Sequence, residues 1–137
     1  VKQLLTNAVG MRVKMLGRLS EGNLAKLYRA GDIYVWPAVN EAFGISFLEA
    51  QASGLPIICQ NYGGVSDIMK TGQTGFLVDK EDTIGFADAI DKLLTDTKLR
   101  NLMSIRAQQF VNEERSLSKT AKELDKILSA TVLNSKN

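Results

Sequence analysis

The chain has no histidine, one cysteine and two prolines among its 137 residues. Without histidine it cannot supply a Ser-His-Asp triad, a Cys-His pair or a histidine ligand to a metal. The single Cys59 excludes a disulfide framework and fits a reducing compartment, and its apolar neighbours predict a buried strand position. Chemistry carried by these residues must therefore use carboxylates, backbone dipoles and a bound substrate.

Other patterns are missing as well. The sequence has no glycine-rich phosphate loop, no dinucleotide fingerprint and no Asp-x-Asp pair for a divalent metal. No apolar run approaches the roughly 18 residues that span a bilayer. The net charge of +2 is spread along the chain and gives no argument for a nucleic-acid partner. We expect a cytoplasmic protein, free or peripheral at the cytoplasmic face of the membrane, with no membrane span in this chain.

The composition is that of an ordinary globular domain, with 45% apolar and 23% charged residues. A chain of this length is enough for one domain and too short for two. The opening segment, from Val1 to Ala8, has the spacing of a helix tail. We therefore expect residues 1–137 to form a single partial domain that begins inside a longer protein.

Strand and helix signals alternate along the chain. We expect strands at 12–16, 32–36, 56–59 and 76–78, and helices at 21–30, 45–53, 65–70 and onward from 83, 96 and 116. This alternation over short loops predicts an α/β fold, a Rossmann-like parallel sheet with helices on both faces. The apolar run at 33–36 predicts a strand buried on both faces, with Tyr34 and Trp36 in the core more readily than in a stacking platform.

Three unusual loops follow predicted strands, at 17–20, 37–44 and 61–64. Right-handed crossovers bring the carboxyl ends of parallel strands to the same edge of the sheet. Ligands of open α/β sheets bind beyond that edge. We therefore expect the three loops to converge on one crevice.

The segment from Glu41 to Glu49 carries the most chemical information. Gly44 stands where a loop turns into a helix, and its backbone can approach a ligand closely because it lacks a Cβ. The amides of Ile45 and Ser46 come next, and such helix-start donors favour an anion such as a diphosphate. Glu49, one turn on, is suited to accept hydrogen bonds from a ribose diol. Glu41 is suited to contact sugar hydroxyls and to stabilise positive charge at an anomeric carbon.

Simpler readings stand beside this one. Taken singly, either glutamate is more readily a solvated or capping carboxylate, because charged residues are mostly exposed. A glycoside hydrolase that uses both as acid and nucleophile is a further reading. It is disfavoured because its two carboxylates must face one another across a bond, whereas one of these lies on a helix beside an anion site.

Glu41 to Glu49 resembles the E-x7-E motif of retaining GT-B glycosyltransferases of family 4, glycosyl transferases group 1. The resemblance runs from Met11 to Leu128, and the flanking residues stand in the register of the family. They include Gly17-Arg18-Leu19-Ser20, Gly54-Leu55-Pro56, Gly63-Gly64 and Thr74-Gly75.

This resemblance implies transfer of a hexose-type sugar from a nucleotide-diphosphate sugar to an acceptor with retention, in polysaccharide or glycoconjugate biosynthesis. The chain would be the C-terminal donor-binding domain, and a sugar or lipid-linked acceptor would bind the N-terminal domain, which is absent from it. No metal and no cofactor is implied, the nucleotide sugar being a substrate. Glu41 would be catalytic, and the donor-binding residues would be Gly17, Arg18, Leu19, Phe43, Gly44, Ile45, Ser46 and Glu49.

Two further functions stay open. The chain lacks the earlier segment in which the family usually carries a basic pair that clamps the diphosphate, so one reading is a nucleotide-sugar-binding fragment without activity of its own. The other is a different GT-B enzyme, such as a sugar-nucleotide epimerase or a phosphorylase, since a shared architecture does not fix a function.

Overall fold

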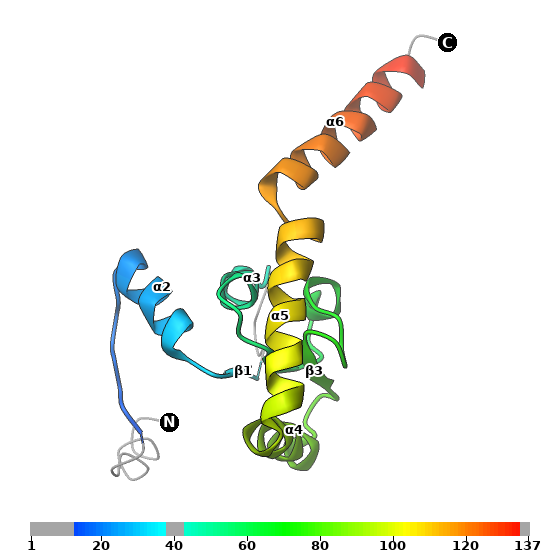
Figure 1. The fold of residues 1–137 in the computed structure, drawn as a ribbon. Helices are drawn as coiled ribbons and strands as arrows, with labels where there is room; N and C mark the ends of the chain where they lie inside the picture. Colours follow the sequence, from blue (N-terminus) through cyan, green and yellow to red (C-terminus); the bar gives the residue numbers. More distant parts are fainter. Residues whose placement is uncertain (1–12, 38–42, 135–137) are drawn as a thin grey trace.

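The computed structural model describes residues 13–37 and 43–134, with the side chains of the helical residues described as far as residue 131. The predicted helix tail at 1–8 and Glu41 lie outside these ranges. The elements are α2 (Glu21–Ala30), β1 (Tyr34–Trp36), α3 (Ile45–Ala52), β2 (Ile57–Gln60), the 3-10 helix η1 (Val65–Ile68), β3 (Gly75–Val78), α4 (Thr83–Thr95), α5 (Thr97–Glu114) and α6 (Leu117–Asn134) (Figure 1).

The three strands form one parallel sheet in the order β1-β2-β3. In its register, Val35 is opposite Ile58, and Ile58 is opposite Phe76. All four residues of β2 are buried, as expected of a central strand covered on both sides. The fold is α/β and Rossmann-like, as the alternation of signals predicted.

Each face of the sheet has its own apolar core, because successive strand residues point to opposite sides. Ile57 and Cys59 of β2 pack with Phe47 of α3 and with residues of η1 and its neighbourhood. Ile58 points the other way and packs with residues of α4 and α5, among them Leu93 and Met103. Helices therefore cover both faces, and α3 lies on the side of Ile57 and Cys59.

Local sequence signals set several helix boundaries. Asp82 accepts a hydrogen bond from the Gly85 amide at 2.8 Å and caps α4, and Asp96 does the same for Leu99 at the start of α5. Gly54 follows α3 with φ of 87°, the left-handed conformation that ends helices. These boundaries confirm the predictions from the sequence, except that the helix expected at 65–70 is the short 3-10 turn η1.

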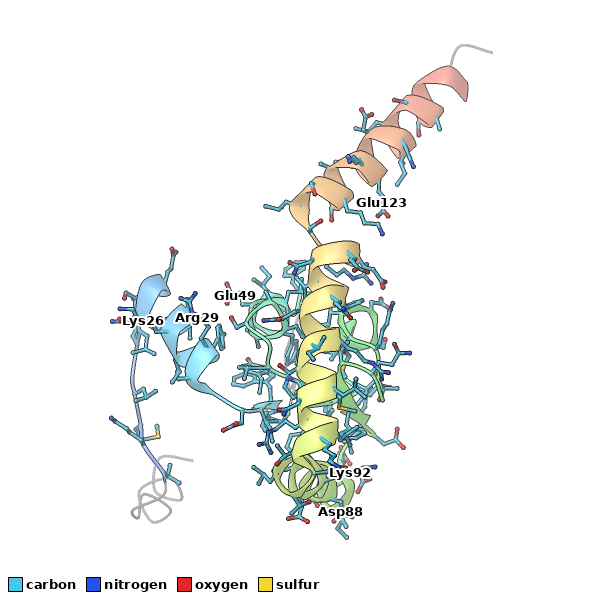
Figure 2. The ribbon with its side chains drawn as sticks, in the orientation of Figure 1. Lys26, Arg29, Glu49, Asp88, Lys92 and Glu123 are labelled. Atoms are coloured by element: carbon cyan, nitrogen blue, oxygen red, sulfur yellow. The ribbon has the colours of Figure 1, made fainter. Side chains whose placement is uncertain are left out.

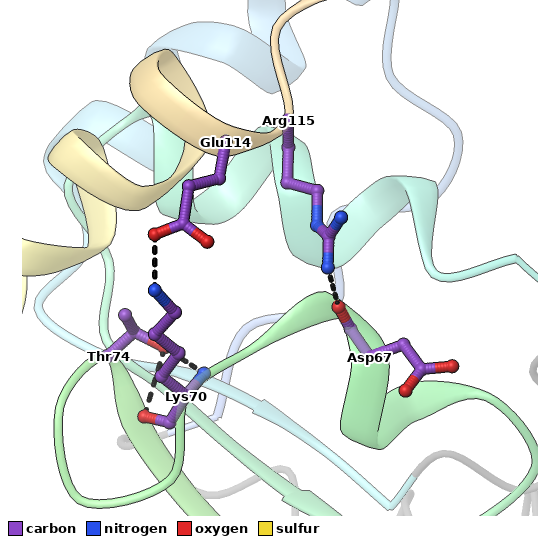
Figure 3. A network of polar contacts seen from close by, with 5 residues as sticks. All are labelled: Asp67, Lys70, Thr74, Glu114 and Arg115. Atoms are coloured by element: carbon purple, nitrogen blue, oxygen red, sulfur yellow. Dashed lines mark hydrogen bonds and ion pairs between the residues drawn. The ribbon is translucent and has the colours of Figure 1, made fainter. Parts of the chain in front are cut away.

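Polar contacts hold α3 and α5 in place. The fully buried Gln51 of α3 donates from Nε2 to the Ile68 carbonyl of η1 at 2.8 Å. At the end of α5, Glu114 pairs with Lys70, and Arg115 donates to the Asp67 carbonyl (Figure 3). The hydrogen bond from Lys70 lowers the pKa of the Glu114 carboxyl. The segment that joins η1 to β3 is thereby tied to the end of α5.

Two predictions about strands were wrong. β1 is not buried on both faces: Val35 is 38% exposed and Trp36 43%, so Trp36 is not a core residue either. The reason is that β1 is the edge of the described sheet and pairs only with β2. The described part of the predicted 12–16 strand, residues 13–16, forms no strand, because no strand of the described sheet lies beside it to supply a hydrogen-bonded ladder.

Two helices stand apart from the layered body. α2 has no buried residue and contacts α3, and α6 extends away from the end of α5 (Figure 1). Four large apolar side chains of α6 are exposed, those of Leu117, Leu124, Ile127 and Leu128. Among the described residues, no helix combines the length and apolar character needed to cross a bilayer.

Candidate functional site

The start of α3 is built around Gly44. Its φ of 66° is left-handed, and a Cβ placed on it would lie 2.0 Å from Ile68 Cδ1. Backbone conformation and packing therefore both require glycine at this position. Gly44 is buried, but Ile45 immediately after it is 62% exposed, so the helix opens at the surface and not into the core.

The first amides of α3 point out of this opening. The amides of Phe47 and Leu48 donate to the Gly44 carbonyl at 3.1 and 3.2 Å. Within the described part of the chain, no hydrogen bond from the amides of Ile45 or Ser46 is found. Such helix-start donors, together with the helix dipole, attract anions.

A polar stripe runs along α3 from this end, with Ser46, Glu49 and Ser53 at helical spacing. The Tyr34 hydroxyl of β1 donates to Ser46 Oγ at 3.1 Å. Glu49 is exposed and lies on the side of α3 that faces α2 (Figure 2).

A pocket of about 390 Å³ lies between α2 and α3. Its polar groups include the Glu49 carboxylate and the Tyr28 hydroxyl. Burial, with smaller contributions from Tyr34 and the Glu49 carboxylate, raises the pKa of Tyr28 to about 12. The complete lining is Glu21, Leu24, Ala25, Tyr28, Glu49, Ala52 and Ser53.

Two other pockets contain none of the predicted site residues. One lies along β3 and α4 and includes Asp79, Asp88 and Lys92. The other lies between residues 70–74 and α5 and includes Arg106 and Glu113. In the described ranges, no three acidic or cysteine side chains are grouped so that they could share a metal ion.

Comparison with known proteins identifies the family. The family described as "Glycosyl transferases group 1" matches residues 2–110, which is most of the chain. The chain belongs to the glycosyl transferases group 1 family.

One similar member of this glycosyltransferase family is the D-inositol 3-phosphate glycosyltransferase of Corynebacterium diphtheriae. It is 39% identical over 105 residues, which cover 75% of this chain and 25% of that protein. The chain thus spans about a quarter of the length of this relative.

Solved structures of other proteins share the fold. Sucrose-phosphate synthase from Thermosynechococcus elongatus superposes with a TM-score of 0.84 and 25% identity, over 97% of this chain and 34% of that chain. Anabaena Alr3699/HepE, crystallised in complex with UDP-glucose, superposes with a TM-score of 0.79 over 94% of this chain and 35% of that chain. The latter is 23% identical to this chain, so the similarity shows a shared fold alone.

The residues expected to bind the donor fall into two groups in this member of the family. Gly44, Ile45, Ser46 and Glu49 lie together on the first turns of α3, with Phe43, which is 80% exposed, just before them. The other group, Gly17, Arg18 and Leu19, precedes α2, whose N-cap is Ser20.

The loop at 17–20 does not line the pocket between α2 and α3, and neither does the loop at 61–64. The loop at 37–44 is described only in part, and Glu41 falls outside the described residues. Convergence of the three loops on one crevice therefore stays a prediction.

Two residues at the site were not predicted to act there. Tyr34 was expected in the core, and Tyr28 was assigned no role at the site. Both residues are half-buried; the Tyr34 hydroxyl bonds Ser46 of α3, and Tyr28 shares a pocket with Glu49. A tyrosine on a half-exposed helix or an edge strand is a weak signal, because its apolar ring and polar tip suit many such positions.

Proposed function

We propose that this chain is the donor-binding part of an enzyme that transfers a hexose-type sugar from a nucleotide-diphosphate sugar to an acceptor with retention of configuration. The observation that carries the proposal is the start of α3. There a glycine with a left-handed backbone and little space for a side chain opens the helix at the surface, and Glu49 lines a pocket one turn further on.

The diphosphate is proposed to bind at the amides of Ile45 and Ser46. Its negative charge is complemented by the partial positive charge at the helix start, and backbone donors are held in place before binding. The Ser46 hydroxyl lies at the same end of the helix and adds a donor.

The ribose is proposed to bind at Glu49. A carboxylate near a diphosphate is repelled unless neutral donors stand between them, and two ribose hydroxyls serve that purpose. The pocket beside Glu49 has apolar walls from Leu24, Ala25 and Ala52, which suit the flat faces of a nucleoside. Arg18 and Leu19 are proposed to contact the base through backbone atoms.

Glu41 is proposed as the catalytic carboxylate that stabilises positive charge developing at the anomeric carbon. We propose that no metal takes part and that the partial positive charge at the start of α3 balances the negative charge of the diphosphate. The acceptor, a sugar or a lipid-linked sugar, is proposed to bind a second domain of a longer protein, and the chain alone to bind donor without transfer. The family membership and the share of the relatives' length that the chain spans support this division.

The test begins with a thermal-shift screen of the intact protein against UDP-, GDP- and ADP-sugars, since a ligand that binds only the folded state raises the melting temperature. We expect Glu49→Ala to weaken binding of the selected nucleotide sugar by about 1–3 kcal/mol, the range for a lost charged hydrogen bond. Glu123→Ala on α6 is the matched control, because that carboxylate is exposed and lies far from α3 (Figure 2). Equal binding by the Glu49 variant and the control contradicts the ribose role.

A further inference from the structure

Two tyrosines from different elements contact the polar stripe of α3. Tyr34 on β1 donates to Ser46 Oγ at 3.1 Å. Tyr28 on α2 and Glu49 on α3 line the same pocket, and the Glu49 carboxylate is close enough to help raise the pKa of Tyr28. Ser46 and Glu49 are three residues apart, so both hydroxyls meet the same face of the helix.

The two rings are held in a chain that leads into the core. Tyr28 and Tyr34 pack edge to face, with ring centroids 5.9 Å apart and an interplanar angle of 69°. Tyr34 packs in the same way on Phe47, at 5.6 Å and 88°. Because Phe47 is fully buried, this chain of rings limits where the two hydroxyls can go.

The two tyrosines affect which atoms of α3 remain for a ligand. Across the shared pocket, a protonated Tyr28 hydroxyl is placed to donate to the Glu49 carboxylate, which would leave the other carboxylate lone pairs for hydroxyl donors. Ser46 Oγ accepts from Tyr34, so the serine's own proton points elsewhere, where it can donate to an anion at the helix start.

We propose that Tyr28 and Tyr34 are positioning residues of the donor site, Tyr28 orienting Glu49 for the ribose and Tyr34 orienting Ser46 for the diphosphate. The inference rests on the proposed function, because Glu49 and Ser46 are donor-binding residues only within it. Neither tyrosine needs to touch the donor. Each acts through a side chain of α3 that does.

The test measures nucleotide affinity of the intact protein by titration calorimetry, with UDP and 2′-deoxy-UDP as probes, or GDP and 2′-deoxy-GDP where the screen selects guanine. Tyr28→Phe keeps the ring and removes the hydroxyl. We expect it to weaken ribonucleotide binding roughly 2- to 10-fold, the effect of one lost hydrogen bond. The loss should be smaller with the deoxynucleotide, since one of the hydroxyls that Glu49 is proposed to hold is then missing.

Tyr34→Phe is tested with the diphosphate and the monophosphate of the same nucleoside. We expect a weakening of the same size with the diphosphate and a smaller one with the monophosphate. In steady-state assays with the intact enzyme, both variants should raise the KM for the donor more than they lower kcat. A general loss of structure would weaken the binding of all these ligands to the same extent.

A double-mutant cycle and a control complete the design. In a Glu49→Ala background, Tyr28→Phe should have no further effect on affinity, because the side chain it orients is gone. Thr95→Val is the matched control: it removes a hydroxyl that bonds the Asp91 carbonyl within α4, away from α2 and α3. Melting temperatures of all variants show whether each one folds.

The outcomes separate this inference from the proposed function. If Glu49→Ala weakens binding and Tyr28→Phe does not, positioning by Tyr28 is overturned and the ribose role of Glu49 stands. If Tyr28→Phe weakens the binding of the ribonucleotide and the deoxynucleotide equally, or if its effect on affinity adds to that of Glu49→Ala, positioning through Glu49 is also overturned. If Glu49→Ala leaves affinity unchanged, the proposed ribose role and the positioning role of Tyr28 fail together, and an equal effect of Tyr34→Phe on diphosphate and monophosphate overturns the role of Tyr34.

Discussion

The replacement of Gly44 by alanine tests the packing around the start of α3. Alanine at a φ of 66° adopts a left-handed conformation that costs about 1–2 kcal/mol. Its Cβ would also meet Ile68 Cδ1 at 2.0 Å and Phe47 Cδ2 at 3.0 Å, and relief of such overpacking typically costs about 1–3 kcal/mol. The two contributions together predict a loss of about 2–5 kcal/mol in the free energy of unfolding.

The matched control is Gly72→Ala, which separates the two contributions. Gly72 has a φ of 75°, and a Cβ placed on it has no neighbour within 4 Å. This variant should therefore lose only the conformational part, about 1–2 kcal/mol. The difference between the two variants measures the clash with Ile68 and Phe47.

The assay is urea unfolding followed by far-UV circular dichroism, with the free energy extrapolated to water. Equal losses for the two variants would show that Ile68 moves aside without cost, and would refute the claim that packing requires glycine at position 44. A variant that retains stability but loses nucleotide affinity would place the effect of Gly44 at the ligand instead.

Three further predictions concern catalysis, metal dependence and the thiol. Glu41→Ala should lower kcat by more than it weakens donor binding, and a variant with normal kcat would remove Glu41 from the mechanism. Transfer by the intact enzyme should persist in excess EDTA, and loss of activity that Mg²⁺ restores would contradict the proposed metal-free transfer. Burial raises the pKa of Cys59 from 9.0 to about 12. Its thiol should react with Ellman's reagent at pH 8 only after unfolding in urea, and fast reaction in the native state would contradict its burial.

The raised pKa of Cys59 also makes the stability of the fold depend on pH. The unfolded chain loses this proton near pH 9 and the folded chain only near pH 12, so the unfolded state binds fewer protons between those values. The contribution of Cys59 to stability is therefore complete below pH 9 and is lost as the pH rises toward 12. Cys59→Ala should lose less stability than the unmodified protein as the pH rises from 9 toward 12, and urea unfolding curves at several pH values measure this difference.

Predictions from short-range patterns agreed best with the structure. The helix at 21–30, the cap at Asp82, the left-handed Gly54 after α3 and the buried β2 were all predicted, because each depends on residues within a few positions of one another. The grouping of Gly44, Ile45, Ser46 and Glu49 on the first turns of one helix followed in the same way from helical spacing.

The errors arose where remote segments decide the outcome. The apolar run ending in Trp36 indicated a fully buried strand, but burial depends on which strands lie on each side, and β1 is an edge in the described sheet. The alternating residues at 13–16 indicated a strand, but a strand exists only with a partner to share its hydrogen bonds.

By itself, the sequence was sufficient to determine the α/β class, the order and approximate limits of most elements, and the position of the glycine and the polar stripe on α3. Only the tertiary structure decided that Ile68 closes the space beside Gly44, that Glu49 and Tyr28 share a pocket between α3 and α2, and that the Tyr34 hydroxyl bonds Ser46. The reason is physical: helix and turn preferences are local free energies of the backbone, whereas burial and hydrogen bonds between elements depend on how distant segments pack.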